Sequence, residues 1–84
     1  MVRNLYLFYD NPINNEIEPF SRYYITPALS QLFEHYKVDC CDNGHLHFKN
    51  SLNSDEFNKF LNEMKDKEYI FFYAIRRNGN IFKI

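Results

Sequence analysis

The sequence predicts one small α+β domain in which two amphipathic helices cover one face of an antiparallel sheet. Two segments repeat apolar residues at the i, i+3, i+4 and i+7 spacing of a helix, and β-rich runs precede, separate and follow them. The chain has 84 residues, with nine Phe and seven Tyr against three Pro and two Gly. We therefore expect a single domain, residues 1–84, with an aromatic core.

The first half of the chain predicts a strand, a loop and a helix. The strand covers Val2–Tyr9 and stops at a turn signal, Asp10-Asn11-Pro12. Two prolines and several Asn and Glu indicate a long loop over Asp10–Ile25. A helix over Pro27–Lys37 follows, since Thr26 can cap it and Pro suits its first position. Its apolar stripe is Leu29, Leu32, Phe33 and Tyr36.

The second half predicts a hairpin, a helix and a final pair of strands. Val38–Asp42 and His45–Lys49 flank Asn43-Gly44, which indicates a two-residue turn with both residues at positive φ. Ser54 caps a helix over Asp55–Lys67, whose apolar stripe is Phe57, Phe60, Leu61 and Met64. The run Glu68–Arg77 is apolar on both sides, and Asn78-Gly79 turns it into a last strand, Asn80–Ile84.

The order of these elements is β-α-β-β-α-β with one extra C-terminal strand. Because crossover connections are right-handed, both helices fall on the same side of the sheet. We therefore expect a ferredoxin-like arrangement, in which the antiparallel sheet has one face covered by the two helices.

Composition narrows the classes of function. Ten Lys and Arg against eleven Asp and Glu give a net charge of -1, which favours neither nucleic-acid binding through bulk charge nor DNA mimicry. No apolar run approaches the roughly 20 residues needed to span a bilayer, so we expect a cytoplasmic protein with no membrane partner. Cys40 and Cys41 are adjacent and cannot staple the fold, which indicates reduced thiols. Eleven Asn, seven Ile and six Lys suggest an AT-rich coding sequence, as in a phage or mobile element.

The predicted hairpin gathers side chains that can ligate a metal. With a two-residue turn, strand alternation places Cys40, Asp42, His45 and His47 on one face. These are ligand types that a tetrahedral zinc ion takes. The alternative is a solvated sheet face, and a shift of one residue in the strand pairing would dissolve the cluster.

Asp10 is the candidate catalytic residue, because it stands at the predicted junction between the first strand and the long loop. A single carboxylate holds Mg²⁺ only together with waters, a phosphate or a second carboxylate, such as Asp10 of a second copy. The alternative is that the Asp-Asn-Pro sequence only ends the strand.

The sheet also predicts an aromatic surface. Since two helices cover only one face, one set of aromatic residues points away from them. This set can bind a partner protein, pair with a second copy or stack bases, or it can lie under the C-terminal strand and the long loop. The predicted partner-binding residues are Tyr6, Phe8, Tyr69, Phe71 and Tyr73. Arg76 and Arg77 supply the positive charge that a nucleic-acid contact would need.

Parts of the chain resemble the family of the small CRISPR-adaptation nuclease subunit and the virulence-associated protein D ribonucleases. The resemblance rests on LYLFYD (Leu5–Asp10), HLHFKNSLNSDEFNKFLNEM (His45–Met64) and YIFFYAIRR (Tyr69–Arg77). It implies a ferredoxin-like dimer packed through sheet faces, with paired Asp10 residues holding a divalent metal for cleavage of RNA or DNA.

Three functions follow. The first is a non-enzymatic binding protein, such as a phage or mobile-element inhibitor of a host defence nuclease of the anti-CRISPR kind, because the chain contains no complete catalytic set. The second is a metal-dependent dimeric endoribonuclease using Asp10, with Arg76 or Arg77 on phosphate. The third is a zinc-stabilised interaction module. We expect no resident cofactor under the first function, Mg²⁺ under the second and Zn²⁺ under the third.

Overall fold

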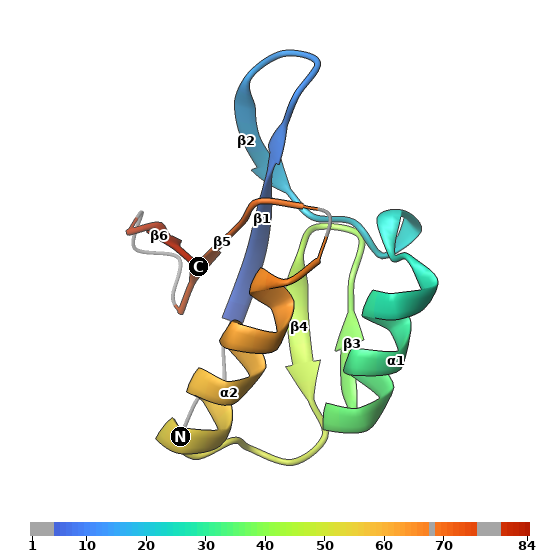
Figure 1. The fold of residues 1–84 in the computed structure, drawn as a ribbon, viewed down its shortest axis with the longest axis vertical. Helices are drawn as coiled ribbons and strands as arrows, with labels where there is room; N and C mark the ends of the chain where they lie inside the picture. The colour runs from blue at the N-terminus through green and yellow to red at the C-terminus, as the bar shows by residue number, and fades with distance from the viewer. Residues whose placement is uncertain (1–4, 68, 76–79) are drawn as a thin grey trace.

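The structure is a computed structural model that describes residues 5–67, 69–75 and 80–84 (Figure 1). It confirms the predicted class, a small α+β domain with an antiparallel sheet and two helices. None of the helices in these ranges is long and apolar enough to cross a membrane. In chain order the elements are β1 (Leu5–Asn11), β2 (Glu16–Pro19), the 3-10 helix η1 (Arg22–Tyr24), α1 (Pro27–Tyr36), β3 (Val38–Cys40), β4 (His45–Phe48), α2 (Ser54–Lys65), β5 (Phe71–Ala74) and β6 (Phe82–Lys83).

Strand β1 lies at the centre of the sheet, whose order is β3-β4-β1-β5-β6. It pairs antiparallel with β4 and β5, and its last four residues pair with β2. Where β4 ends, the backbone bonding continues, because the Leu7 N–H donates to the Gly44 carbonyl across 2.8 Å. A single strand therefore connects the hairpin β3–β4, the hairpin β1–β2 and the C-terminal strands.

Both helices pack on the same face of the sheet. Strand register places Leu5, Leu7 and Leu46 on this face, and all three are fully buried. Phe60 of α2 is also fully buried, and its ring lies 5.9 Å from Phe33 of α1 and 5.7 Å from Phe48 of β4. The stripes predicted for the two helices supply the side chains of this core.

A second aromatic cluster surrounds Phe20, in the segment predicted to be a long loop. Phe20 is fully buried, and its ring lies 5.4 Å from both Tyr69 and Phe71 and 6.0 Å from Tyr9. The loop prediction was wrong here, because β2 pairs with β1 and η1 follows it. Asn and Glu disfavour strands only weakly when a neighbouring strand supplies the hydrogen bonds.

The helix boundaries agree with the predicted ones to within two residues, and one cap differs. Thr26 caps α1 as predicted, with its hydroxyl accepting from the Leu29 N–H at 3.2 Å. The cap of α2 is Asn53 and not Ser54, because Asn53 and Glu56 form a reciprocal capping box. An Asn three residues before a Glu satisfies two backbone donors at once.

The turn between β3 and β4 differs from the predicted one. The Cys41 N–H donates to the His45 carbonyl at 2.9 Å and the Gly44 N–H donates to the Cys41 carbonyl at 3.2 Å, which leaves a three-residue loop. Gly44 has positive φ, +86°, whereas Asn43 is not among the described residues that do. A three-residue loop of this kind needs glycine only at its last position. The predicted pairing is therefore wrong by one residue, since Cys40 pairs with Leu46.

The C-terminal strands are shorter than predicted. Strand β5 covers four residues within the predicted Glu68–Arg77, and β6 pairs with it as the extra C-terminal strand. The predicted turn at Asn78-Gly79 lies outside the described residues.

Candidate functional site

The face of the sheet opposite the helices, called the open face below, carries the side chains of chemical interest. Register and strand alternation define its members. They are Tyr6, Phe8, Asp10, Ile17, Pro19, Asp39, His45, His47, Phe72, Ala74 and Lys83.

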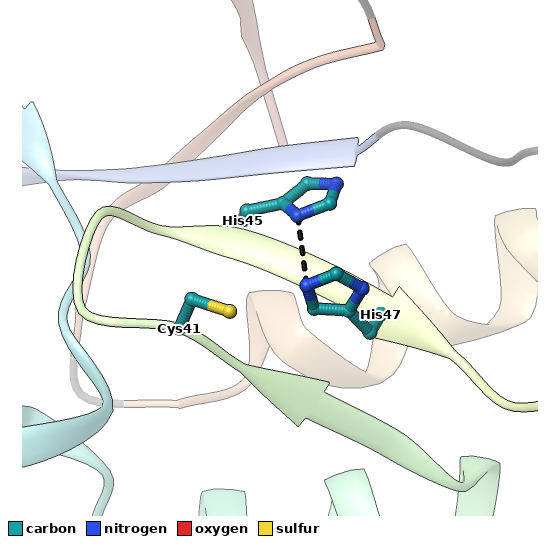
Figure 2. Close-up of side chains that lie close together, drawn as sticks. All are labelled: Cys41, His45 and His47. Carbon is teal, nitrogen blue, oxygen red and sulfur yellow. Dashed lines mark hydrogen bonds between the residues drawn. The ribbon is translucent and has the colours of Figure 1, made fainter.

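Cys41, His45 and His47 form a cluster on this side of the hairpin β3–β4 (Figure 2). One ligand atom from each residue lies within 4.8 Å of the others. The Nδ1 atom of His45 is 3.0 Å from the Nε2 atom of His47, a hydrogen bond whose donor depends on the tautomers. The two histidines share a face because they are two residues apart in a strand, and the turn brings Cys41 opposite them.

The ring of Tyr6 supports this cluster from β1. It stacks on the imidazole of His45 with ring centroids 4.8 Å apart and planes inclined by 29°. His45 is half-buried as a result, whereas His47 is exposed. The imidazole that lies between Tyr6 and His47 is therefore held in one orientation by both neighbours.

Two of the four predicted zinc ligands do not belong to the cluster. The shift in pairing turns Cys40 toward the core, where its Sγ lies 3.8 Å from the Phe20 carbonyl. Burial is the main reason that the pKa of the Cys40 thiol rises to about 12, with the neighbouring Cys41 and Asp42 adding to the effect. Asp42 forms an ion pair with Arg22, whose Nε lies 2.7 Å from its carboxylate.

Asp10 lies within β1 and not at its end. Asp10 pairs with Ile17 of β2, and the Asp10 N–H donates to the Ile70 carbonyl at 3.1 Å. Among the described residues, Asp10 is in no group of three or more His, Cys, Asp or Glu side chains arranged to hold a metal. The nuclease role implied by the resemblance stays a prediction.

The predicted aromatic surface contains residues from both faces. Tyr6 and Phe8 lie on the open face, and the residues beside them on β5 are Ala74 and Phe72. Phe71 is instead buried on the helix face, and Tyr73 packs against Phe57 of α2 with ring centroids 5.7 Å apart. Tyr69 packs against Phe20. The prediction that these five aromatics share one surface was wrong, because β5 has the opposite alternation to the one assumed.

An apolar row crosses the open face from β2 to β5. Pro19 pairs with Phe8, and Phe8 pairs with Phe72. Pro19 is exposed and both phenylalanines are half-buried, so the row presents hydrophobic surface. Ile17, two residues before Pro19, is 45% exposed on the same face.

The hairpin β1–β2 extends away from the helices and the rest of the sheet (Figure 1). At its turn, the side chain of Ile13 is 92% exposed. Sequence reasoning missed this residue, because a strand following the turn was not expected. The signal available was Ile17 between Glu16 and Glu18, a short alternation of polar and apolar residues that follows the polar turn.

Glu18 fixes the shape of this hairpin. Its carboxylate accepts hydrogen bonds from Asn14 Nδ2 at 2.9 Å, Asn11 Nδ2 at 3.0 Å and the Tyr9 hydroxyl at 3.3 Å. The hydrogen bond from Asn14 is the largest cause that lowers the pKa of Glu18, followed by the one from Asn11. Asn15 adopts the left-handed conformation that the turn requires, with φ +57°.

The predicted nucleic-acid residues, Arg76 and Arg77, lie outside the described residues. Comparison of the chain with protein-family models, curated proteins and solved structures found no match.

Proposed function

We propose that this chain is a small binding protein that engages a protein partner through the open face and the hairpin β1–β2. The single observation that carries the proposal is Ile13, a large apolar side chain 92% exposed on a hairpin whose turn is held by side-chain hydrogen bonds. An apolar side chain carried on a fixed turn requires less ordering on binding than one on a mobile loop, so its burial adds to affinity.

The apolar row next to the hairpin supports the same surface. Ile17 continues from the turn toward Pro19, Phe8 and Phe72, so that hydrophobic side chains follow one another from the hairpin onto the sheet. Aromatic and apolar residues at the centre of a patch, with polar residues around them, are typical of protein interfaces.

Charge favours a protein over a nucleic acid as the partner. The open face carries Asp10 and Asp39 against Lys83 among its described residues, and Glu16 and Glu18 lie on the neighbouring hairpin strand. A phosphate backbone requires Lys and Arg on the contact surface. The partner is expected to offer an apolar pocket that accepts an isoleucine.

The ferredoxin-like assignment is part of this proposal. The order β3-β4-β1-β5, with one helix after the first strand pair and one after β4, supports it, whereas β2 and β6 are additions to that arrangement. The hairpin β1–β2 is thus the insertion that would give a common scaffold its particular partner.

The test compares surface variants in affinity capture from the native host. Tagged wild-type protein and a Lys59→Glu variant, changed on an exposed position of α2, are expected to retain the same protein at equal stoichiometry. Ile13→Asn is expected to reduce its retention at least tenfold without changing the circular dichroism spectrum. Retention equal to wild type by Ile13→Asn, or capture of nucleic acid alone, would contradict the proposal.

A further inference from the structure

The cluster on the hairpin β3–β4 meets the chemical requirements of a transition-metal site, and it is separate from Ile13 and the apolar row. Thiolate and imidazole are the ligands that zinc prefers, and the three side chains come from one short hairpin. We infer that Cys41, His45 and His47 bind one zinc ion, which keeps a fourth position for water or for a ligand from outside the chain.

The separations between the ligand atoms are close to those that a tetrahedral ion needs. Zinc bonds of about 2.0–2.1 Å to nitrogen and 2.3 Å to sulfur correspond to about 3.3 Å between two nitrogens and about 3.6 Å between nitrogen and sulfur. The two imidazole nitrogens are 3.0 Å apart, and the sulfur is within 4.8 Å of the histidine ligand atoms. The difference from the required distances is at most about 1.2 Å for the sulfur and about 0.3 Å for the nitrogens, which is within reach of side-chain rotation.

The protein holds the ligands in place before any ion binds. The backbone N–H of Cys41 donates to the His45 carbonyl at 2.9 Å, so the main chains that carry these two ligands are fixed to one another. Tyr6 stacks on one face of the His45 ring, and the hydrogen bond to His47 orients its Nδ1 atom. A metal ion replaces that hydrogen bond by accepting the lone pairs of both nitrogens, and the ring that donated the hydrogen bond then carries its proton on its other nitrogen.

Two neighbouring residues that were predicted as ligands are engaged elsewhere. Arg22 holds Asp42 at 2.7 Å, and Cys40 faces Phe20 in the core. A shallow groove beside the cluster, lined by Asp39, Asp42 and His45 among others, leaves the fourth position accessible. Three protein ligands with an open position are typical of zinc sites that take a further ligand.

The two adjacent cysteines provide a matched pair for the test. Cobalt(II) serves as a spectroscopic probe, because a tetrahedral thiolate complex gives a sulfur-to-metal charge-transfer band, and zinc affinity is measured by competition with that signal. Cys41→Ala is expected to abolish the band and to weaken zinc binding at least about a hundredfold, more than changes to outer residues typically do. Cys40→Ala and His35→Ala are expected to leave both the band and the affinity unchanged.

A structural readout accompanies the spectra. In nuclear magnetic resonance, zinc is expected to shift the imidazole signals of His45 and His47 and to leave those of His35 in place. The inference is overturned if wild-type protein shows no charge-transfer band and no zinc-dependent shifts. It is also overturned if Cys40→Ala, while folded, loses the metal and Cys41→Ala retains it, since that result would restore the predicted pairing.

Discussion

The amide of Leu7 donates to the carbonyl of Gly44 across 2.8 Å, and this hydrogen bond joins the central strand to the turn that carries the histidines. The Leu7 carbonyl in turn accepts from the Phe20 N–H at 2.9 Å. Three segments far apart in the sequence therefore meet at one glycine.

Substitution of Gly44 by alanine tests this junction. A Cβ atom at that position would lie 2.4 Å from the Leu7 carbonyl oxygen and 3.2 Å from the backbone of Phe20. The φ angle of Gly44 is +86°, a left-handed conformation that alanine rarely adopts. Left-handed strain and the backbone clash together are expected to lower the free energy of unfolding by about 2 kcal/mol or more, measured by urea denaturation. Asn43→Ala, the control in the same turn, is expected to cost less than about 1.5 kcal/mol, and an equal cost for both variants would contradict the role of Gly44.

We expect the hairpin β1–β2 to lose stability in acid, because its hydrogen bonds depend on the ionised carboxylate of Glu18. Because its hydrogen bonds lower the pKa of Glu18 in the folded chain, the stabilisation they give is complete above the ordinary value of 4.5 and is lost as pH falls through the lower folded value. Amide hydrogen exchange at Asn15 and Glu16 is expected to accelerate in Glu18→Gln at pH 6 relative to wild type. Unchanged exchange in the variant would show that the hairpin does not depend on this carboxylate.

We expect the wild-type protein and a Tyr36→Phe variant to differ in stability at alkaline pH. Burial, with a smaller effect of the neighbouring Glu63, raises the pKa of Tyr36 to about 12 from 10. The unfolded chain loses the phenol proton first, so the folded state loses stability between about pH 10 and pH 12. Tyr36→Phe is expected to lose less stability than wild type when urea denaturation is compared at pH 9 and pH 11.5. Equal losses would mean that Tyr36 titrates normally.

The two thiols are expected to differ in reactivity. The pKa of Cys40, raised to about 12 mainly by burial, leaves almost no thiolate at pH 8, and the thiolate is the reactive form. Iodoacetamide in the absence of metal is expected to modify Cys41 at least ten times faster than Cys40, measured by peptide mass spectrometry. Comparable rates would place Cys40 outside the core.

Local signals in the sequence were sufficient for the helices and insufficient for the pairing of strands. Thr26 and the two apolar stripes describe α1 and α2 because helix contacts lie within a few residues. The turn at Asn43-Gly44 admits two loop lengths, and the hydrogen bonds from Leu7 to Gly44 and from Phe20 to Leu7, contacts distant in sequence, accompany the longer one. Because of that one-residue difference, Cys41 and not Cys40 joins the two histidines in the candidate metal site.

Dependence on contacts distant in sequence also limited the prediction of the open face. Strand β5 has apolar residues on both sides, so alternation alone could not say which set meets the helices. Pairing of Tyr6 with Ala74 and of Phe8 with Phe72 decides it. The hairpin β1–β2 could not be predicted for a related reason. Its strand β2 is mostly polar, and pairing with β1 stabilises it rather than burial of its own side chains.

The central place of β1 also has a consequence for synthesis of the chain. About sixty residues separate the end of β1 from the start of β5, its partner along one edge. While a ribosome is still making α2, Leu5, Leu7 and Tyr9 lack the strand that will lie beside them, and a β-rich segment with an unpaired edge tends to aggregate. Pairing of β1 along that edge must therefore wait until β5 has left the exit tunnel, and slow translation of the residues between α2 and β5 would prolong the exposure of β1.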